Sequence, residues 1–367
     1  MPIYMDRHDL PEDISAEHVA GIHQEDLKVE HKYGCKGLTY WFDDKRKTAF
    51  CLIDAPNKEA LENMHDHAHG GIPNSIIEVD PSIVESFLGR IEDPVKAQNS
   101  DLNIINDPAF RIIMVTAYTK GSLNNTDLFP NKETRENYNN AMVKLLINFN
   151  GSLVKKKPDC LLISFESISD AVLCAIEIQN QFKDFINKNN STDLKLKIGL
   201  SSGIPVTEKD NFFEDTINLA ERLCNVVLGQ IVVSSEVKDL FESENLNVII
   251  DTELVRTLNS SDEKFLNVLM DFTEKTWNKS NLKVDDFSTN LGLSKSQLYR
   301  KVKSITGKSL NSFVKEYRLQ KALDLLERQK GNISEIAFET GFNSPAYFSK
   351  CFFETYGVLP SRYLESA

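Results

Sequence analysis

Apolar positions in the first 80 residues recur at strand spacing and then at helix spacing, twice over. Two stretches, 16–32 and 58–67, repeat apolar residues at helical spacing. Four shorter runs are rich in β-branched and aromatic residues and end at turn residues, as strands do: 3–5, 38–42, 48–53 and 76–79. The resulting βαββαβ order predicts a ferredoxin-like sandwich.

Residues 109–245 show a second alternation of strand and helix patterns. The predicted strands are 111–116, 151–154, 160–165 and 195–201, and the predicted helices are 133–149 and 169–188. The runs 216–224 and 229–234 follow them. Polar stretches at 91–108 and 246–261 are expected to be linkers. The chain is therefore expected to be multidomain: two α+β domains, 1–90 and 109–245, followed by an all-α domain, 262–367.

Residues 262–367 carry helical patterns, and two of the turns between helices share the same chemistry. Gly292 and Gly341 can adopt the left-handed conformation that ends a helix. Ser294 and Ser344 follow them as N-caps of the next helix, and Ser344 is followed by proline at the first helical position. Two helix-turn-helix motifs in tandem are predicted.

The stretch 309–328 between these motifs keeps a helical period, which predicts one rigid spacer helix. Two recognition helices on such a spacer can enter successive major-groove turns, about 34 Å apart, on one face of a duplex. The alternative is a helical bundle with a solvated basic face, which the periodicity alone would also fit.

From about Asp262 to Ala367 these motifs resemble the AraC-type transcription regulators, including the closing run 352–363. The resemblance implies that the recognition helices meet double-stranded promoter DNA. The implied base-facing residues are Ser296, Tyr299 and Arg300 in the first motif, with Gln297 beside them, and Ala346, Ser349 and Lys350 in the second. Lysines that more plausibly meet phosphates are Lys295, Lys301, Lys303 and Lys308.

Charge agrees with that expectation. From Asp262 onward 16 Lys and Arg face 13 Asp and Glu, a net charge of +3, whereas the whole chain carries −12. The acidic remainder would repel DNA, so DNA contact should be confined to the C-terminal domain.

All seven histidines lie within the first 69 residues. On a helix His65 and His69, at i and i+4, share a face, as do His23 and Asp26 at i and i+3. Asp6 and His8, two apart on a strand, also share a face. Imidazole with carboxylate suits nickel, zinc, copper or iron better than calcium or magnesium. His18, His31 and His67 are interpreted as surface histidines.

The same segment resembles a family of small, dimeric, nickel-binding ferredoxin-like proteins, in residues 1–9, 40–43, 65–70 and 76–79. The resemblance implies nickel or another transition metal near five residues, with Glu78 a weaker candidate: Asp6, His8, His23, His65 and His69. It also implies a homodimer.

Residues 217–223 and 229–234 resemble the class III nucleotidyl cyclase domain. Those enzymes hold two metal ions on two aspartates. Here Asp159 matches the second aspartate, but Ala117 stands at the position of the first. Asn218 and Arg222 match positions that orient the ribose and stabilise transition-state charge, and Lys155 matches a purine-selecting position. Asn218 and Arg222 could equally be helix residues retained in an interface. We therefore expect a domain without cyclase activity that binds nucleotide or forms a dimer.

The function expected from the sequence is sequence-specific transcription regulation, with metal or nucleotide as effector. The six cysteines are scattered and no apolar run is long enough to span a membrane, so we expect a cytoplasmic protein without a membrane partner. RNA polymerase is a further expected contact. The rival hypotheses are an active cyclase coupled to a DNA-binding domain and a metal store fused to a regulator.

Overall fold

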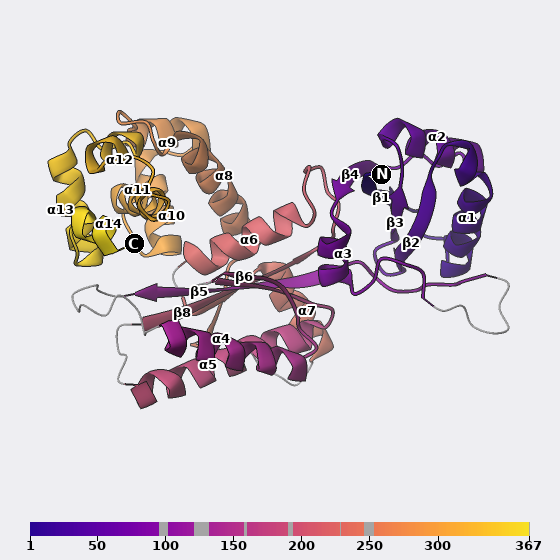
Figure 1. Ribbon diagram of the computed structural model, residues 1–367, viewed down its shortest axis with the longest axis horizontal. Helices are drawn as coiled ribbons and strands as arrows, with labels where there is room; N and C mark the ends of the chain where they lie inside the picture. The colour runs from indigo at the N-terminus through magenta and orange to yellow at the C-terminus, as the bar shows by residue number, and fades with distance from the viewer. Residues whose placement is uncertain are drawn as a thin grey trace.

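The computed structural model describes residues 1–94, 102–120, 132–157, 160–189, 194–227, 229–245 and 253–366. In these residues a four-stranded sheet is followed by a six-stranded sheet and then by a group of helices (Figure 1). This order confirms the predicted fold class. Among the described residues no helix is both long and apolar enough to cross a membrane.

The N-terminal domain has the predicted βαββαβ order. Its elements are β1 (Ile3–Asp9), α1 (Ala16–Val29), the short helix η1 (Glu30–Lys32), β2 (Lys36–Asp43), β3 (Thr48–Asp54), α2 (Lys58–His69) and β4 (Ser75–Val79). The strand order is β2-β3-β1-β4, and all pairs are antiparallel. Ser15 and Asn57 cap α1 and α2 with their side chains, and Gly70 ends α2 at a φ of 73°.

The two faces of this sheet pack against different partners. On one face Tyr4, Tyr40 and Cys51 pack against α1 and α2. On the other, Met5 and Trp41 pack against α3 (Pro81–Leu88), and through it against the middle domain. The sequence patterns did not predict α3, although Asp80 caps it and Pro81 starts it.

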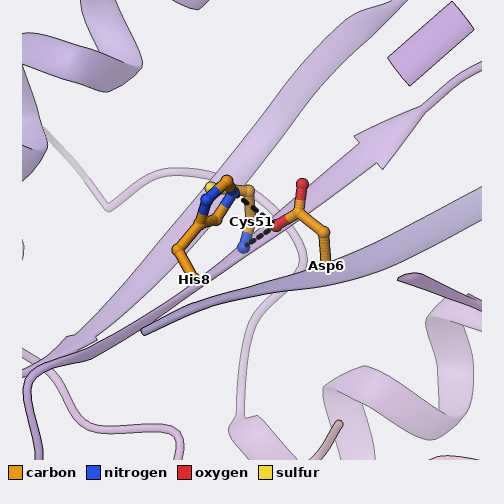
Figure 2. A group of neighbouring side chains, drawn as sticks. All are labelled: Asp6, His8 and Cys51. Atoms are coloured by element: carbon orange, nitrogen blue, oxygen red, sulfur yellow. Dashed lines mark hydrogen bonds and ion pairs between the residues drawn. The ribbon is translucent and has the colours of Figure 1, made fainter. Parts of the chain in front are cut away.

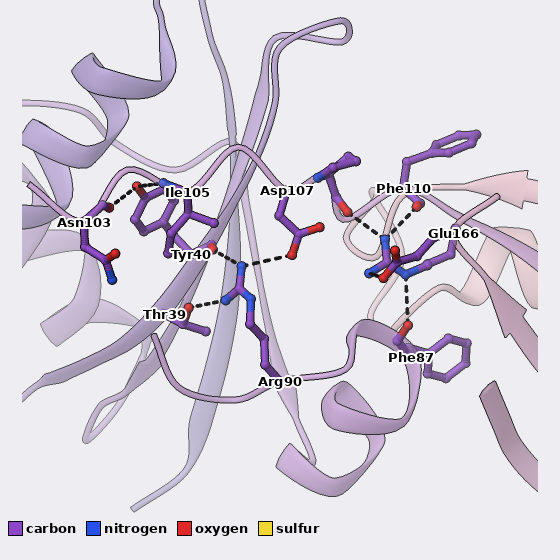
Figure 3. A network of polar contacts seen from close by, with 11 residues as sticks. Thr39, Tyr40, Phe87, Arg90, Asn103, Ile105, Asp107, Phe110 and Glu166 are labelled. Carbon is purple, nitrogen blue, oxygen red and sulfur yellow. Dashed lines mark hydrogen bonds and ion pairs between the residues drawn. The ribbon is translucent and has the colours of Figure 1, made fainter. Parts of the chain in front are cut away.

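Part of the predicted linker 91–108 belongs to the N-terminal domain. Residues 102–107 run along the exposed edge of β2, where the Phe42 amide donates to the Asp107 carbonyl and Tyr40 Oη donates to the carbonyl of Asn103. Arg90 donates to Thr39, to the Tyr40 carbonyl and to Asp107 (Figure 3). The segment is ordered because an edge strand leaves backbone groups that need partners.

Arg111 is the matching anchor on the middle domain. Its buried guanidinium donates to the carbonyls of Phe87, Pro108 and Phe110 and to Glu166. Figure 3 labels three of these partners, Phe87, Phe110 and Glu166. Arg111 therefore links the end of α3 to the start of the middle sheet, and Ser164 of β7 donates to the same Phe87 carbonyl.

The middle domain is a six-stranded sheet of order β10-β9-β8-β5-β7-β6. In chain order its elements are β5 (Arg111–Lys120), α4 (Lys132–Asn148), β6 (Ser152–Lys157), β7 (Cys160–Phe165), α5 (Ile168–Asn189), β8 (Leu194–Gly203), α6 (Glu214–Asn225), β9 (Ile231–Val233), α7 (Ser235–Glu244) and β10 (Val255–Thr257). Helices α4, α5 and α7 cover one face, and α6 lies on the other (Figure 1). The strand β10 falls in the predicted linker 246–261 and pairs in parallel with β9. It has three residues, which is too short a pattern to predict a strand from the sequence.

The C-terminal domain consists of helices in the described residues: α8 (Ser260–Thr276), α9 (Val284–Leu291), α10 (Lys295–Thr306), α11 (Leu310–Glu327), α12 (Ile333–Glu339), α13 (Pro345–Tyr356) and α14 (Pro360–Ser366). Helix α11 is the predicted spacer. Leu310 and Phe313 at its start pack into the core of the first helix-turn-helix motif, and Leu319 and Leu326 further on pack into that of the second.

Candidate metal and nucleic-acid sites

The first cluster of metal-ligand residues joins α1 to α2. Asp26 projects from α1 toward His65 and His69 on α2. The Asp26 Oδ1 atom lies 3.0 Å from His65 Nδ1 and 3.2 Å from His69 Nε2, and the two nitrogens are 3.1 Å apart. Donors bound to one ion at about 2.1 Å lie roughly 3.0–3.4 Å apart. We call Asp26, His65 and His69 the helix triad.

The second cluster lies on the sheet directly below. Asp6 and His8 project from β1, and Cys51 from β3, where it pairs with Asp6 (Figure 2). The Asp6 Oδ1 atom is 3.4 Å from His8 Nε2 and accepts the Cys51 amide at 3.0 Å. One ligand atom from each residue lies within 4.8 Å of the others. We call Asp6, His8 and Cys51 the sheet triad.

The two triads meet at a contact of 2.8 Å between His65 Nε2 and Asp6 Oδ2, and the His8 and His65 rings pack edge to face at 5.1 Å between centroids. The side chains of His65 and Asp6 are fully buried. Burial opposes charge on both, but two carboxylate partners outweigh it at His65 and raise its pKa to about 10. At Asp6, burial is outweighed by His8 and by the hydrogen bond from His65, so its pKa lies below its ordinary value. Asp26 also has a lowered pKa, because the effect of burial is exceeded by hydrogen bonds from His65 and His69.

His23, also predicted as a ligand, belongs to neither triad. Its Nε2 atom lies 3.6 Å from Asp93 Oδ2, and its ring packs against Tyr40 at 4.9 Å between centroids. His23 and Asp26 share a face of α1, but His23 contacts Tyr40 of β2 and Asp93, whereas Asp26 contacts His65 and His69 of α2. Glu78 is exposed on β4 and belongs to neither triad.

The three histidines interpreted as surface residues are exposed. His18 accepts the backbone amide of Ser15 as part of the cap of α1, and His67 contacts Tyr33 Oη at 3.0 Å.

Sequence reasoning missed two residues of these clusters as ligands, Asp26 and Cys51. Asp26 was paired with His23 on α1, and only the packing of α1 on α2 turns it to His65. Cys51 carried no spacing signal, because its position opposite Asp6 depends on the register of β1 and β3. The donor set of two imidazoles and a carboxylate, beside a carboxylate, an imidazole and a thiol, suits zinc, nickel, copper or iron.

The first recognition helix, α10, presents an exposed polar face. Ser294 and Gln297 form a capping box at its start, so the Gln297 side chain is held by the backbone. Ser296, Tyr299 and Arg300 are exposed, while the apolar face of α10 is buried. The base-facing set predicted for this helix is therefore open to solvent.

The lysines around α10 differ in their surroundings. Lys295 pairs with Asp285 at 2.5 Å, and Lys303 donates to the Gly307 carbonyl at the end of the helix. Lys301 turns to α8, where it pairs with Asp262 at 3.3 Å. Lys308 pairs with Glu316.

The second recognition helix, α13, begins as predicted, with Ser344 as N-cap and Pro345 in the first turn. Ala346 and Lys350 are exposed and Ser349 is half-buried. Lys350 lies 3.9 Å from Glu354. Between the two motifs, bordered by the starts of α10 and α13 and by α11, lies a cavity of about 810 Å³.

Of the residues assigned to nucleotide binding, Asn218 and Arg222 lie on α6 and Lys155 lies on β6. Arg222 on α6 donates to Asn267 at 2.8 Å and Asp271 at 2.5 Å on α8, and lies 3.5 Å from Glu274. Lys155 is exposed on the edge strand β6, and Asn218 is half-buried on α6. Asp159 lies outside the described residues, and Ala117 is buried on β5.

Two segments of the chain match protein-family models. Residues 4–79 match the model described as "Nickel responsive protein SCO4226-like", and residues 287–366 match one described as "Helix-turn-helix domain". The chain therefore carries an N-terminal domain of the first kind and a C-terminal domain of the second.

Relatives and solved structures cover parts of the chain. "Histidine kinase P4" of Formosa agariphila is 33% identical over 168 residues, 45% of this chain and 11% of that protein. "HTH-type transcriptional regulator MtrA" of Neisseria gonorrhoeae is 34% identical over 117 residues, 31% of this chain and 37% of that protein. The crystal structure of SCO4226 from Streptomyces coelicolor A3(2) is 31% identical, covers 21% of this chain and 94% of that chain, and has a TM-score of 0.20. The chain thus spans well under half the length of both curated relatives.

Proposed function

We propose that this protein is a sequence-specific DNA-binding transcription regulator whose N-terminal domain binds a transition metal as its effector. The observation that carries the proposal is the pair of capped helix-turn-helix motifs joined by one continuous helix, α11, which packs into both cores. Such a pair can read two successive major-groove segments.

Direct readout is assigned to Arg300, Tyr299 and Ser296 in α10, and to Ala346, Ser349 and Lys350 in α13. Arginine can donate two hydrogen bonds to guanine in the major groove, and exposure of Arg300 leaves it able to do so. Lys303 serves phosphate contact better than Lys295 and Lys301, because it donates to a neutral carbonyl, whereas Lys295 and Lys301 are paired with the carboxylates of Asp285 and Asp262.

The helix triad is the favoured metal site. His65 donates from Nε2 to the Asp6 carboxylate, which leaves Nδ1 directed at Asp26 and His69. A carboxylate behind a histidine fixes the ring and increases its basicity as a ligand. A bound ion would replace the proton that His65 shares with Asp26.

Helix α6 provides a route from the metal-binding domain to the DNA-binding domain. Phe213, before its first turn, has a left-handed φ of 54° and stacks on Phe87 of α3 at 5.0 Å between centroids. Toward its other end Arg222 binds α8, and Leu223 packs into the same core as Leu266 of α8. A displacement of α3 would therefore reach α8 through a single helix.

Residues 109–245 are further proposed to form a cyclase-like domain without activity, because Ala117 provides no metal ligand. The alternative function, a cyclase coupled to a DNA-binding domain, predicts cyclic nucleotide when the protein is incubated with ATP or GTP and Mn²⁺ or Mg²⁺. A product that disappears in Asp159→Asn would favour that alternative. Assembly as a homodimer and contact with RNA polymerase are proposed from the resemblance to the AraC-type regulators and the nickel-binding family.

The test is operator affinity at fixed salt while Ni²⁺ is added to metal-free protein, with Zn²⁺ for comparison, on a duplex selected by the protein itself. A tenfold change corresponds to about 1.4 kcal/mol of coupling between metal and DNA. His65→Asn should abolish the response, whereas the exposed His31→Asn should preserve it. If Ni²⁺ binds and affinity stays constant in the parent protein, the metal is not the effector.

A further inference from the structure

We infer that the sheet triad is a second metal site with a thiolate ligand, joined to the helix triad through Asp6. The inference rests on the proposed metal binding at the helix triad but adds a ligand, Cys51, and a second ion of a thiophilic transition metal such as nickel, cobalt or zinc.

The two triads use different ligand atoms. His65 Nδ1, His69 Nε2 and Asp26 Oδ1 face one another in the first. Asp6 Oδ1, His8 Nε2 and the Cys51 thiol face one another in the second (Figure 2). No donor atom is shared between these sets, so an ion in one set leaves the other complete.

Burial separates the sheet triad from a chance surface cluster. Asp6 is fully buried and Cys51 is 9% exposed, while the side chain of His8 is 13% exposed. Burial raises the pKa of the Cys51 thiol, so a metal ion would bind with loss of the thiol proton. The resulting carboxylate, thiolate and neutral imidazole together carry two negative charges, which a divalent ion neutralises. The triad supplies three ligands, and a water molecule can take the fourth position of a four-coordinate ion, which the partly exposed side chain of His8 permits.

Asp6 also couples the two sites. Its Oδ1 atom belongs to the sheet triad, and its Oδ2 atom accepts from His65 Nε2 at 2.8 Å. An ion on Oδ1 withdraws charge from the carboxylate and weakens it as an acceptor for His65. A metal ion in the sheet triad should therefore lower the metal affinity of the helix triad, and an ion in the helix triad should lower that of the sheet triad by the same factor.

The experiment titrates the metal-free, full-length protein with Co²⁺ and Ni²⁺, and follows bound equivalents together with thiolate-to-metal charge-transfer absorption. The expected result is two equivalents per chain and a charge-transfer band. Cys51→Ser should lose the band and one equivalent, and His8→Asn should weaken the band. Cys35→Ser, which removes another buried thiol outside both triads, should keep both.

A single equivalent in the parent protein, two equivalents without a band, or a band that survives Cys51→Ser would each overturn the inference. The DNA measurement is separate. If the protein binds one equivalent of metal and operator affinity changes with metal, the second site is rejected and the proposed function stands. If the protein binds two equivalents and shows the charge-transfer band, but operator affinity stays constant, the second site stands and the metal-responsive function is rejected.

Discussion

Replacing Arg222 by methionine should loosen the DNA-binding domain from the middle domain. The side chain of Arg222 is 10% exposed and reaches three acceptors on α8: Asn267, Asp271 and Glu274. Methionine keeps the unbranched stem and removes the charge, so the change isolates the polar contacts from the surrounding apolar packing.

The magnitude follows from the exposure of the partners. A hydrogen bond to a charged group contributes about 1.5–3 kcal/mol, whereas an exposed ion pair contributes about 0.2–1 kcal/mol. Asp271 and Glu274 are 51% and 46% exposed, so water can solvate both carboxylates once the guanidinium is gone. We therefore expect a loss of roughly 1–3 kcal/mol rather than the larger cost of stranding a buried charge.

Hydrogen exchange of the α8 amides in low denaturant measures this loss locally, without requiring the whole chain to unfold in one step. A double-mutant cycle with Asp271→Asn should give a coupling energy of about 0.5–2 kcal/mol. Lys238→Met is the control, because Lys238 forms an exposed pair with Glu242 within α7. Additive effects of Arg222→Met and Asp271→Asn would refute the assignment of Arg222 as an interdomain contact.

Three further predictions test other parts of the molecule. Arg300→Ala should cost about 1–3 kcal/mol of discrimination at one base position, measured by binding to a panel of mutated operators; equal loss on every sequence would contradict base readout. The affinity for metal should rise by up to tenfold per pH unit toward about pH 10, because the raised pKa of His65 means that a metal ion must displace a proton from it. Calorimetry in buffers of different ionisation enthalpy counts the released proton. An affinity that does not change with pH would argue against His65 as a ligand. Gly341→Ala should lower the free energy of unfolding by about 1–3 kcal/mol, a larger loss than Gly292→Ala should cause. Both glycines have positive φ, but an added Cβ meets the Asn278 carbonyl at 2.9 Å only at Gly341, so equal losses would contradict the close approach.

The sequence determined the local structure well. Periodicity and capping residues are properties of neighbouring positions, so the βαββαβ order, the spacer helix and both helix-turn-helix turns could be predicted. Asp6 with His8, and His65 with His69, share a face by spacing alone, and the structure brings these two pairs together.

Tertiary structure decided which of these groups meet. Asp26 contacts His65 because α1 packs on α2, and Cys51 lies beside Asp6 because of the register of β1 and β3. His23, on the same helix as Asp26, contacts Asp93 instead. Arg222 matched a nucleotide-binding position by resemblance, but α8 supplies its acceptors in the fold. Each of these contacts joins residues far apart in the chain, and spacing along the sequence carries information only about neighbours.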